Sequence, residues 1–276
     1  MAISEKIRLL GKGLYKDIPD VLTLKALPTI CELDYISGED YDRTMLEKIL
    51  PQAIEEKINP KELLELDYYW VCRCLRFLNY GPYYTSNVLY CEHCGALHGE
   101  YRVDLRAVEC RPLPEGFVNH IKVSANSLMS FDKDIVVRLL TIQERLNAYQ
   151  DKQFARADGS IDRLLARICY MVKSIGEDDK LSPIDVRLIL EQKLSSADYI
   201  MLKDAVSDLT DYGLRAGGST RCPRCGRPNA ASFVALVDDR FLRPTVGDLR
   251  EWKHNRASGR DTNLFGNPSE DVRKDS

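Results

Sequence analysis

Four of the nine cysteines stand in two Cys-x-x-Cys pairs, a spacing that suits a metal ion. The first pair is Cys91 and Cys94 in LYCEHCGAL, and the second is Cys222 and Cys225 in RCPRCGRPN. Each pair is followed by glycine, which takes positive φ without steric cost and so suits the tight turn of a zinc knuckle. Two knuckles supply four thiolates, which close a tetrahedral site. The sequence therefore predicts one structural Zn²⁺ per chain.

The long separation of the two pairs leaves alternatives open. About 127 residues lie between Cys94 and Cys222, whereas a compact zinc ribbon needs about 15–20. The intervening chain must then be a folded insertion that returns to close the site. The alternatives are two unrelated turns with free thiols, or a site in which His93 or His98 replaces a cysteine. A closed four-cysteine site has no open position for catalysis, so we predict a structural staple.

The composition is that of a soluble globular protein. The chain has 276 residues, of which 44% are hydrophobic and 29% are charged, enough for one large domain or two modest ones. The formal net charge of -3 gives no electrostatic reason to expect nucleic acid or an anionic membrane as a partner. The first residues lack the apolar core of a signal peptide, and no apolar run approaches the ~18 residues of a membrane span. We expect reduced cytosolic thiols rather than disulfides.

Short strands are expected on either side of each knuckle. Apolar and charged residues alternate over 101–106, and residues 84–90 read as a strand before the first knuckle, which then forms the tip of a β-hairpin. The second knuckle follows Gly217 and Gly218 and precedes an expected strand over 232–237. Helices are expected over 67–80, 160–175, 182–194 and from Ser195 to near Gly213. The predicted fold class is α+β, mostly helical with short strands and a discontinuous four-cysteine zinc ribbon formed by two β-hairpin knuckles.

A short pattern recurs three times along the chain. The segments 27–33, 139–145 and 243–249 each place threonine three residues before an acid, which is the spacing of a helix capping box. Capping boxes are common, so the similarity is either chance or a trace of duplication. A duplication would give one knuckle to each half. We accordingly predict units over 1–124 and 125–249, followed by a tail over 250–276 that is flexible or ordered by a partner.

Several of these motifs together resemble a known family. The run Leu75-Arg-Phe-Leu-Asn-Tyr-Gly81 precedes Tyr90-Cys-Glu-His-Cys-Gly95, and helices over 184–209 lead into Arg221-Cys-Pro-Arg-Cys-Gly226. This order is similar to the T-even-type tailed-phage baseplate (hub or assembly) protein family, over residues 13–249. The resemblance implies a structural or assembly subunit whose partners are other tail and baseplate subunits. It implies a place in the host cytoplasm during assembly and in the virion if the subunit is retained. The metal cysteines are the one site that it carries over.

The sequence favours this role over two alternatives. It has no phosphate loop, no Gly-x-Ser-x-Gly elbow and no His-Glu-x-x-His motif, so we expect neither enzymatic activity nor a small-molecule substrate. The main alternative is a zinc-ribbon protein that binds nucleic acid. Arg221, Arg224 and Arg227 flank the second knuckle and suit phosphates. The net acidity of the chain, with Glu92 and Glu100 beside the first knuckle, opposes that alternative.

Overall fold

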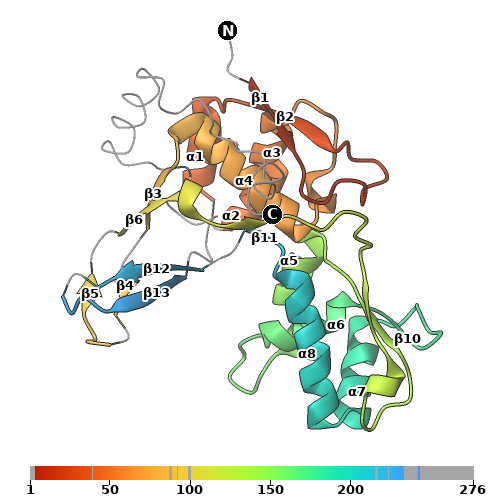
Figure 1. Ribbon diagram of the computed structural model, residues 1–276. Helices are drawn as coiled ribbons and strands as arrows, with labels where there is room; N and C mark the ends of the chain where they lie inside the picture. Colours follow the sequence, from red (N-terminus) through yellow and green to blue (C-terminus); the bar gives the residue numbers. More distant parts are fainter. Residues whose placement is uncertain are drawn as a thin grey trace, which may run out of the picture. The chain divides into compact units, whose positions relative to one another are not determined.

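A computed structural model describes residues 4–38, 40–86, 89–91, 93–98, 101–214, 217–222, 224–232 and 242. The fold is α+β with short antiparallel strands, as predicted (Figure 1). The chain forms two compact units. One, here called the discontinuous unit, comprises Met1–Pro60, Leu66–Pro112 and Gly213–Ser276. The other, here called the inserted unit, comprises Lys61–Glu65 and Leu113–Tyr212.

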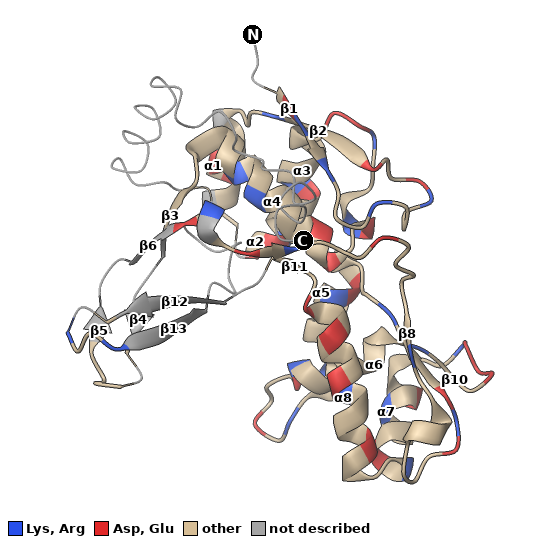
Figure 2. Ribbon diagram, viewed as in Figure 1, with Lys and Arg blue, Asp and Glu red and all other residues tan. Residues whose placement is uncertain are grey.

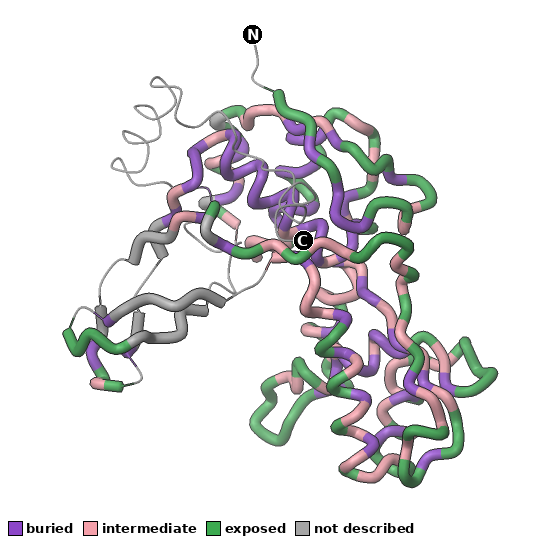
Figure 3. The backbone as a smooth tube through the Cα atoms, in the orientation of Figure 1, coloured by how far each residue is buried: buried purple, intermediate pink, exposed green. Residues whose placement is uncertain are grey.

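The discontinuous unit is built around helix α4 (Glu65–Tyr80), which belongs to it from Leu66 onward. Figure 3 shows α4 almost wholly buried, which agrees with a sequence that is apolar nearly all round. The hairpin of β1 (Ser4–Arg8) and β2 (Val21–Lys25) belongs to the same unit. Its shorter helices are α1 (Thr29–Ile36), α2 (Tyr41–Thr44) and α3 (Leu50–Ala53), with a π-helical stretch over Met45–Ile49 between the last two.

A buried carboxylate ties α4 to the segment after β1. Asp67 is fully buried and accepts hydrogen bonds from the backbone N–H groups of Leu10, at 2.6 Å, and Gly11, at 3.1 Å. The Tyr15 hydroxyl also donates to it. Burial raises the pKa of Asp67 to about 6, although these hydrogen bonds act in the opposite direction.

Paired short strands carry the two cysteine turns. β3 (Tyr83–Ser86) pairs with β6 (Tyr101–Asp104), and β4 (Leu89–Tyr90) pairs with β5 (Leu97–His98) at the first turn. β12 (Gly217–Arg221) and β13 (Pro228–Ser232) flank the second turn. β7 (Cys110–Arg111) pairs with β11 (Gly213–Leu214), so the chain returns beside the point where it left this unit. The prediction that the first turn is the tip of a β-hairpin is confirmed.

The inserted unit combines a small sheet with four helices. The sheet has the order β10-β9-β8, formed by β8 (Ile121–Val123), β9 (Ile135–Val137) and β10 (Val172–Ile175). The helices are α5 (Ile142–Gln150), α6 (Arg163–Met171), α7 (Pro183–Lys193) and α8 (Ser196–Thr210). Capping boxes begin three of them, at Thr141, Ser182 and Ser195. The predicted box of Thr141 and Glu144 is therefore confirmed.

The structure corrects three local predictions. Helix α1 begins at Thr29 with Pro28 at the N-cap and no side-chain cap, and Glu32 accepts a hydrogen bond from the Tyr80 hydroxyl instead. The helix expected over 160–175 ends at Met171, because the residues after it pair with β9. The strand after the second knuckle lies at 228–232, and residues 233–237 are outside the described residues.

The division into units also differs from the predicted halves, 1–124 and 125–249. The discontinuous unit draws on both ends of the chain, because β7 pairs with β11 and the two cysteine turns lie together. The third copy of the threonine pattern and the tail over 250–276 lie outside the described residues. Within the described part of the chain, no helix has both the length and the apolar character that a bilayer span requires.

Candidate metal centre

The first cysteine turn joins β4 to β5. The backbone N–H of Cys91 donates to the carbonyl of Ala96 at 2.9 Å, and the N–H of Gly95 donates to the carbonyl of Cys91 at 2.9 Å. Gly95 has a φ of 67°, in the left-handed region that favours glycine. These bonds fold the chain back on itself, so that Cys91 and Cys94 belong to one turn.

The second turn repeats this backbone geometry between β12 and β13. The N–H of Cys222 donates to the carbonyl of Arg227 at 2.9 Å, and the N–H of Gly226 donates to the carbonyl of Cys222 at 2.8 Å. Gly226 has a φ of 70°. The two turns therefore share the same pair of hydrogen bonds and the same positive φ, and the predicted role of the two glycines is confirmed.

The four sulfur atoms of the two turns form one cluster. All four Sγ atoms lie within 4.8 Å of one another. Across the turns, the distance from Cys91 Sγ to Cys225 Sγ is 3.8 Å, and that from Cys94 Sγ to Cys222 Sγ is 3.7 Å. A tetrahedral ion with metal–sulfur bonds of ~2.3 Å places its ligands ~3.8 Å apart. The cluster thus has the size of a four-thiolate metal site.

Backbone groups and neighbouring thiols set the protonation of the cluster. Burial opposes a low pKa at Cys222, but the N–H groups of Arg224, at 3.3 Å, and Cys225, at 3.4 Å, point at its sulfur and lower its pKa to about 7. Similar backbone bonds lower the pKa of Cys91. The pKa of Cys94 is lowered by the N–H of Ala96, but burial and the neighbouring thiols outweigh this and raise it to about 11. Four adjacent thiolates repel one another, so full ionisation requires a cation in their midst.

The cluster lies at the surface of the hairpins, with its ligands unequally exposed. Cys91 and Cys222 are buried, Cys94 is half-buried and Cys225 is exposed. His93 is exposed, and no histidine joins the cluster among the residues that the structure describes. The structure thus contradicts the alternative of two unrelated turns with separate thiols. It brings together all four cysteines that were predicted as ligands.

Other cysteines are held as buried thiols. Cys31, Cys72, Cys74 and Cys169 are buried, and burial raises the pKa of each. Over the described ranges, the four-cysteine cluster is the one group of three or more Cys, His, Asp or Glu residues close enough to hold an ion. A protonated thiol is not a metal ligand, so the buried thiols of Cys31, Cys72, Cys74 and Cys169 are poor competitors of the cluster for the ion.

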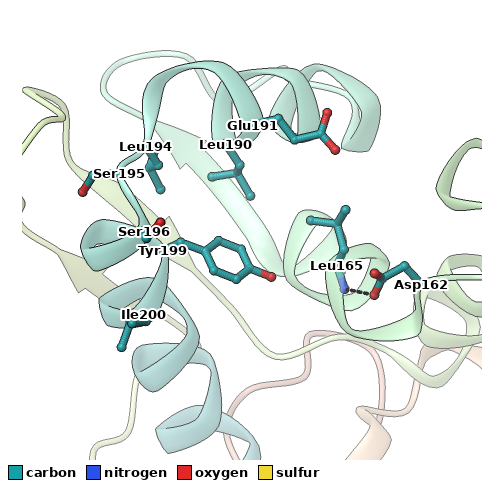
Figure 4. Close-up of a pocket in the computed structure, with 9 residues that line it drawn as sticks. All are labelled: Asp162, Leu165, Leu190, Glu191, Leu194, Ser195, Ser196, Tyr199 and Ile200. Carbon is teal, nitrogen blue, oxygen red and sulfur yellow. Dashed lines mark hydrogen bonds between the residues drawn. The ribbon is translucent and has the colours of Figure 1, made fainter. Parts of the chain in front are cut away.

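Sequence reasoning missed a second feature, an open cavity of about 450 Å³ where α6, α7 and α8 meet (Figure 4). Its lining includes Leu165, Leu190, Leu194, Tyr199 and Ile200. The available signal was the apolar residue Ile200, which follows Tyr199 at the start of α8 and is 56% exposed.

The fold and the cluster define an α+β protein with a four-cysteine group able to hold a metal ion. Comparisons with protein-family models, with curated proteins and with solved structures found no match to this chain.

Proposed function

We propose that the four cysteines bind one structural Zn²⁺ and so complete a discontinuous zinc ribbon. The observation that carries this proposal is the convergence of Cys94 and Cys222, which are 128 positions apart, to a sulfur–sulfur distance of 3.7 Å. Zinc suits the site because thiolates bind Zn²⁺ well and because Zn²⁺ binds four ligands in tetrahedral geometry. With four protein ligands, the ion has no open position for substrate or water. It acts as a staple between the two hairpins.

The protein that this staple supports is, in this proposal, a structural or assembly subunit of a tailed-phage baseplate, in its hub region. The resemblance of residues 13–249 to that family supports the assignment, and the closed set of four sulfur ligands is compatible with it. The subunit acts through contacts with other tail and baseplate subunits. It works in the host cytoplasm during assembly, and in the virion if it is retained there.

Co-expression with the products of the flanking genes tests this role. The expected result is a stable complex with a tail or baseplate subunit, seen as co-elution at a defined stoichiometry in size-exclusion chromatography with light scattering. Neighbouring genes without tail functions, together with a chain that elutes alone after co-expression, would refute the baseplate role. Zinc content, measured on the same preparation, tests the staple independently of the partners.

Binding of nucleic acid is the second candidate, favoured by the charge at the second turn. Arg224 and Arg227 are both exposed there, and guanidinium groups are suited to phosphates. A nucleic-acid-binding role predicts DNA binding that weakens as salt is raised and that is lost in Arg224→Gln/Arg227→Gln. Lys152→Gln/Lys193→Gln, which removes two exposed cations elsewhere, is the matched control. Equal DNA binding by both double variants would exclude a specific role for the second turn.

A further inference from the structure

The cavity at the junction of α6, α7 and α8 has the dimensions of a binding site. Its volume of about 450 Å³ lies within the ~300–1,000 Å³ typical of ligand sites. Its floor is apolar and includes Leu165 from α6, and Leu190 and Leu194 from the end of α7 (Figure 4). A large apolar side chain placed on this floor would be removed from water, which favours binding.

Ile200 forms one wall of the cavity and is its exposed apolar residue. This side chain is 56% exposed in the first turns of α8, at a position where a helix packed on its own core would carry a polar residue. Leu188 on α7 is 45% exposed, but it does not line the cavity. The two residues are therefore similar in type and exposure but differ in their relation to the cavity.

Two polar groups of the cavity, the Tyr199 hydroxyl and the Glu191 carboxylate, can accept further hydrogen bonds. Figure 4 shows Tyr199 extending across the cavity with its hydroxyl directed towards Leu165 and Asp162. Glu191 Oε1 accepts from Arg187 Nε at 2.7 Å. In the described part of the chain, neither the Tyr199 hydroxyl nor Glu191 Oε2 has a hydrogen-bond partner. A bound cation can donate to the carboxylate and to the phenol oxygen.

Negative charge continues from the cavity along one face of α8. Asp204 and Asp208 follow Ile200 by one and two helical turns, so the three side chains lie on the same face. Both aspartates are exposed, and neither forms an ion pair within the described ranges. Figure 2 shows acidic positions, in red, along α8, and Lys203 is the one basic residue in the sequence of this helix. This face therefore combines an apolar hollow with a row of carboxylates.

We propose that the cavity and the acidic face of α8 together dock a basic amphipathic helix of another protein. A large aliphatic or aromatic side chain of that helix fills the cavity against Leu190 and Leu194. Lysine or arginine residues one and two turns away pair with Asp204 and Asp208, and a further cation reaches Glu191. The proposal deepens the docking role given above by stating the chemistry of the partner. Charge complementarity of this kind sets orientation and association rate, while the buried anchor supplies affinity.

Selection from a displayed library of random helical peptides tests the proposal on the immobilised full-length protein. The expected result is enrichment of peptides with an apolar anchor and basic residues one and two helical turns away from it on the same face. A parallel selection on Ile200→Lys, which places a charged side chain at the cavity wall, should yield no such enrichment. The proposal is overturned if the enriched peptides are acidic, or if wild type and Ile200→Lys enrich the same sequences or none.

Fluorescence anisotropy with an enriched peptide then separates the parts of the surface. Ile200→Lys and Asp204→Lys/Asp208→Lys should each weaken binding by about tenfold or more, as expected for an anchor and its paired charges. Leu188→Lys is the matched control for the apolar change and should alter the dissociation constant less than about twofold. Binding should weaken as salt is raised. Equal loss with Leu188→Lys, or no loss with Ile200→Lys, would place the peptide elsewhere.

The same assay distinguishes this proposal from the metal staple. The cavity lies wholly within the inserted unit, whereas the four cysteines lie in the discontinuous unit. If Cys222→Ser/Cys225→Ser loses zinc but still binds the selected peptide, both proposals stand. A failed selection on zinc-loaded protein refutes the docking surface while leaving the staple intact. Peptide binding by a wild-type chain that takes up no zinc refutes the staple alone.

Discussion

Replacing Cys222 and Cys225 with serine should remove the metal and loosen the discontinuous unit. The proposed ion would join turns whose cysteines Cys94 and Cys222 are 128 positions apart, so in the unfolded chain it would close a loop of that length. Chain-entropy theory gives about 5 kcal/mol at 25 °C for a cross-link across such a loop. Formation of the metal–sulfur bonds adds to this figure. In a chain of this size, about 5 kcal/mol corresponds to a fall in Tm of about 10–20 °C.

Two measurements on purified protein test this reasoning together. Elemental analysis should find about one zinc per wild-type chain and almost none in Cys222→Ser/Cys225→Ser. Cobalt substitution of the wild type should produce the thiolate charge-transfer and tetrahedral ligand-field bands of a four-sulfur site. Thermal unfolding should then show the lower Tm. Cys110→Ser is the control, since Cys110 is a half-buried cysteine outside the cluster whose pKa burial raises to about 11.

A specific pattern of results would refute the staple. The metal staple is refuted if wild-type protein purified without chelators holds no zinc and gives no tetrahedral cobalt spectrum. It also fails if the double variant melts within about 2 °C of wild type, because closure of the long loop by metal would then contribute under about 1 kcal/mol. A loss of stability in Cys110→Ser as large as in the double variant would attribute the effect to cysteine substitution in general.

Three further comparisons of variants test other predictions from the fold. Because burial raises the pKa of Asp67 to about 6, the folded state holds a proton that the unfolded chain releases, so stability should fall as pH rises from about 4 to about 6. Urea unfolding of wild type and Asp67→Asn at several pH values measures this dependence. An unchanged slope of stability against pH in the variant would contradict it. A Cβ added at Gly226 meets no atom within 4 Å, so Gly226→Ala should lower the free energy of unfolding only by the ~1–2 kcal/mol that a φ of 70° costs a residue with a side chain. Gly213→Ala should lower it more, because a Cβ at that position comes within 2.9 Å of a leucine side chain. Thermal unfolding ranks the two variants, and the reverse order would refute the geometry. Thr141→Ala should lose ~1 kcal/mol with its capping box, while Thr141→Ser should retain it; equal losses in chemical denaturation would show that the hydroxyl is not the cause.

The cysteine turns could be predicted from sequence because their geometry is encoded locally. Cysteine spacing and the following glycine specify a tight turn whatever surrounds it, and both glycines have the positive φ that this requires. A capping box can also be predicted from local sequence when its threonine is the residue before the helix, as Thr141 is. At Thr29 the same spacing was misleading, because Pro28 occupies the cap position and the helix begins one residue earlier than the box requires.

Features decided by distant contacts could not be read from the chain alone. Residues 172–175 continue the apolar pattern of α6, but pairing with β9 makes them a strand. The division into units depends on the pairing of β7 with β11, which joins segments from opposite sides of the insertion. The cavity depends on the way in which three helices meet, and a sequence shows only that Ile200 is apolar.

Because the inserted unit interrupts the discontinuous unit, a metal at the four cysteines would help to hold the returning chain in position. The chain leaves the discontinuous unit after Pro112 and re-enters it at Gly213, and β7 and β11 then pair over only two residues each. A ladder of that length contributes a few hydrogen bonds of ~0.5–1.5 kcal/mol each, comparable with or below the cost of ordering the returning chain. β12 and β13 follow this short ladder in the sequence, so an ion bound by the four thiolates would add a strong contact between the second hairpin and the first. The proposed metal would then act where backbone pairing is shortest, and its removal should free the second hairpin before it disturbs α4.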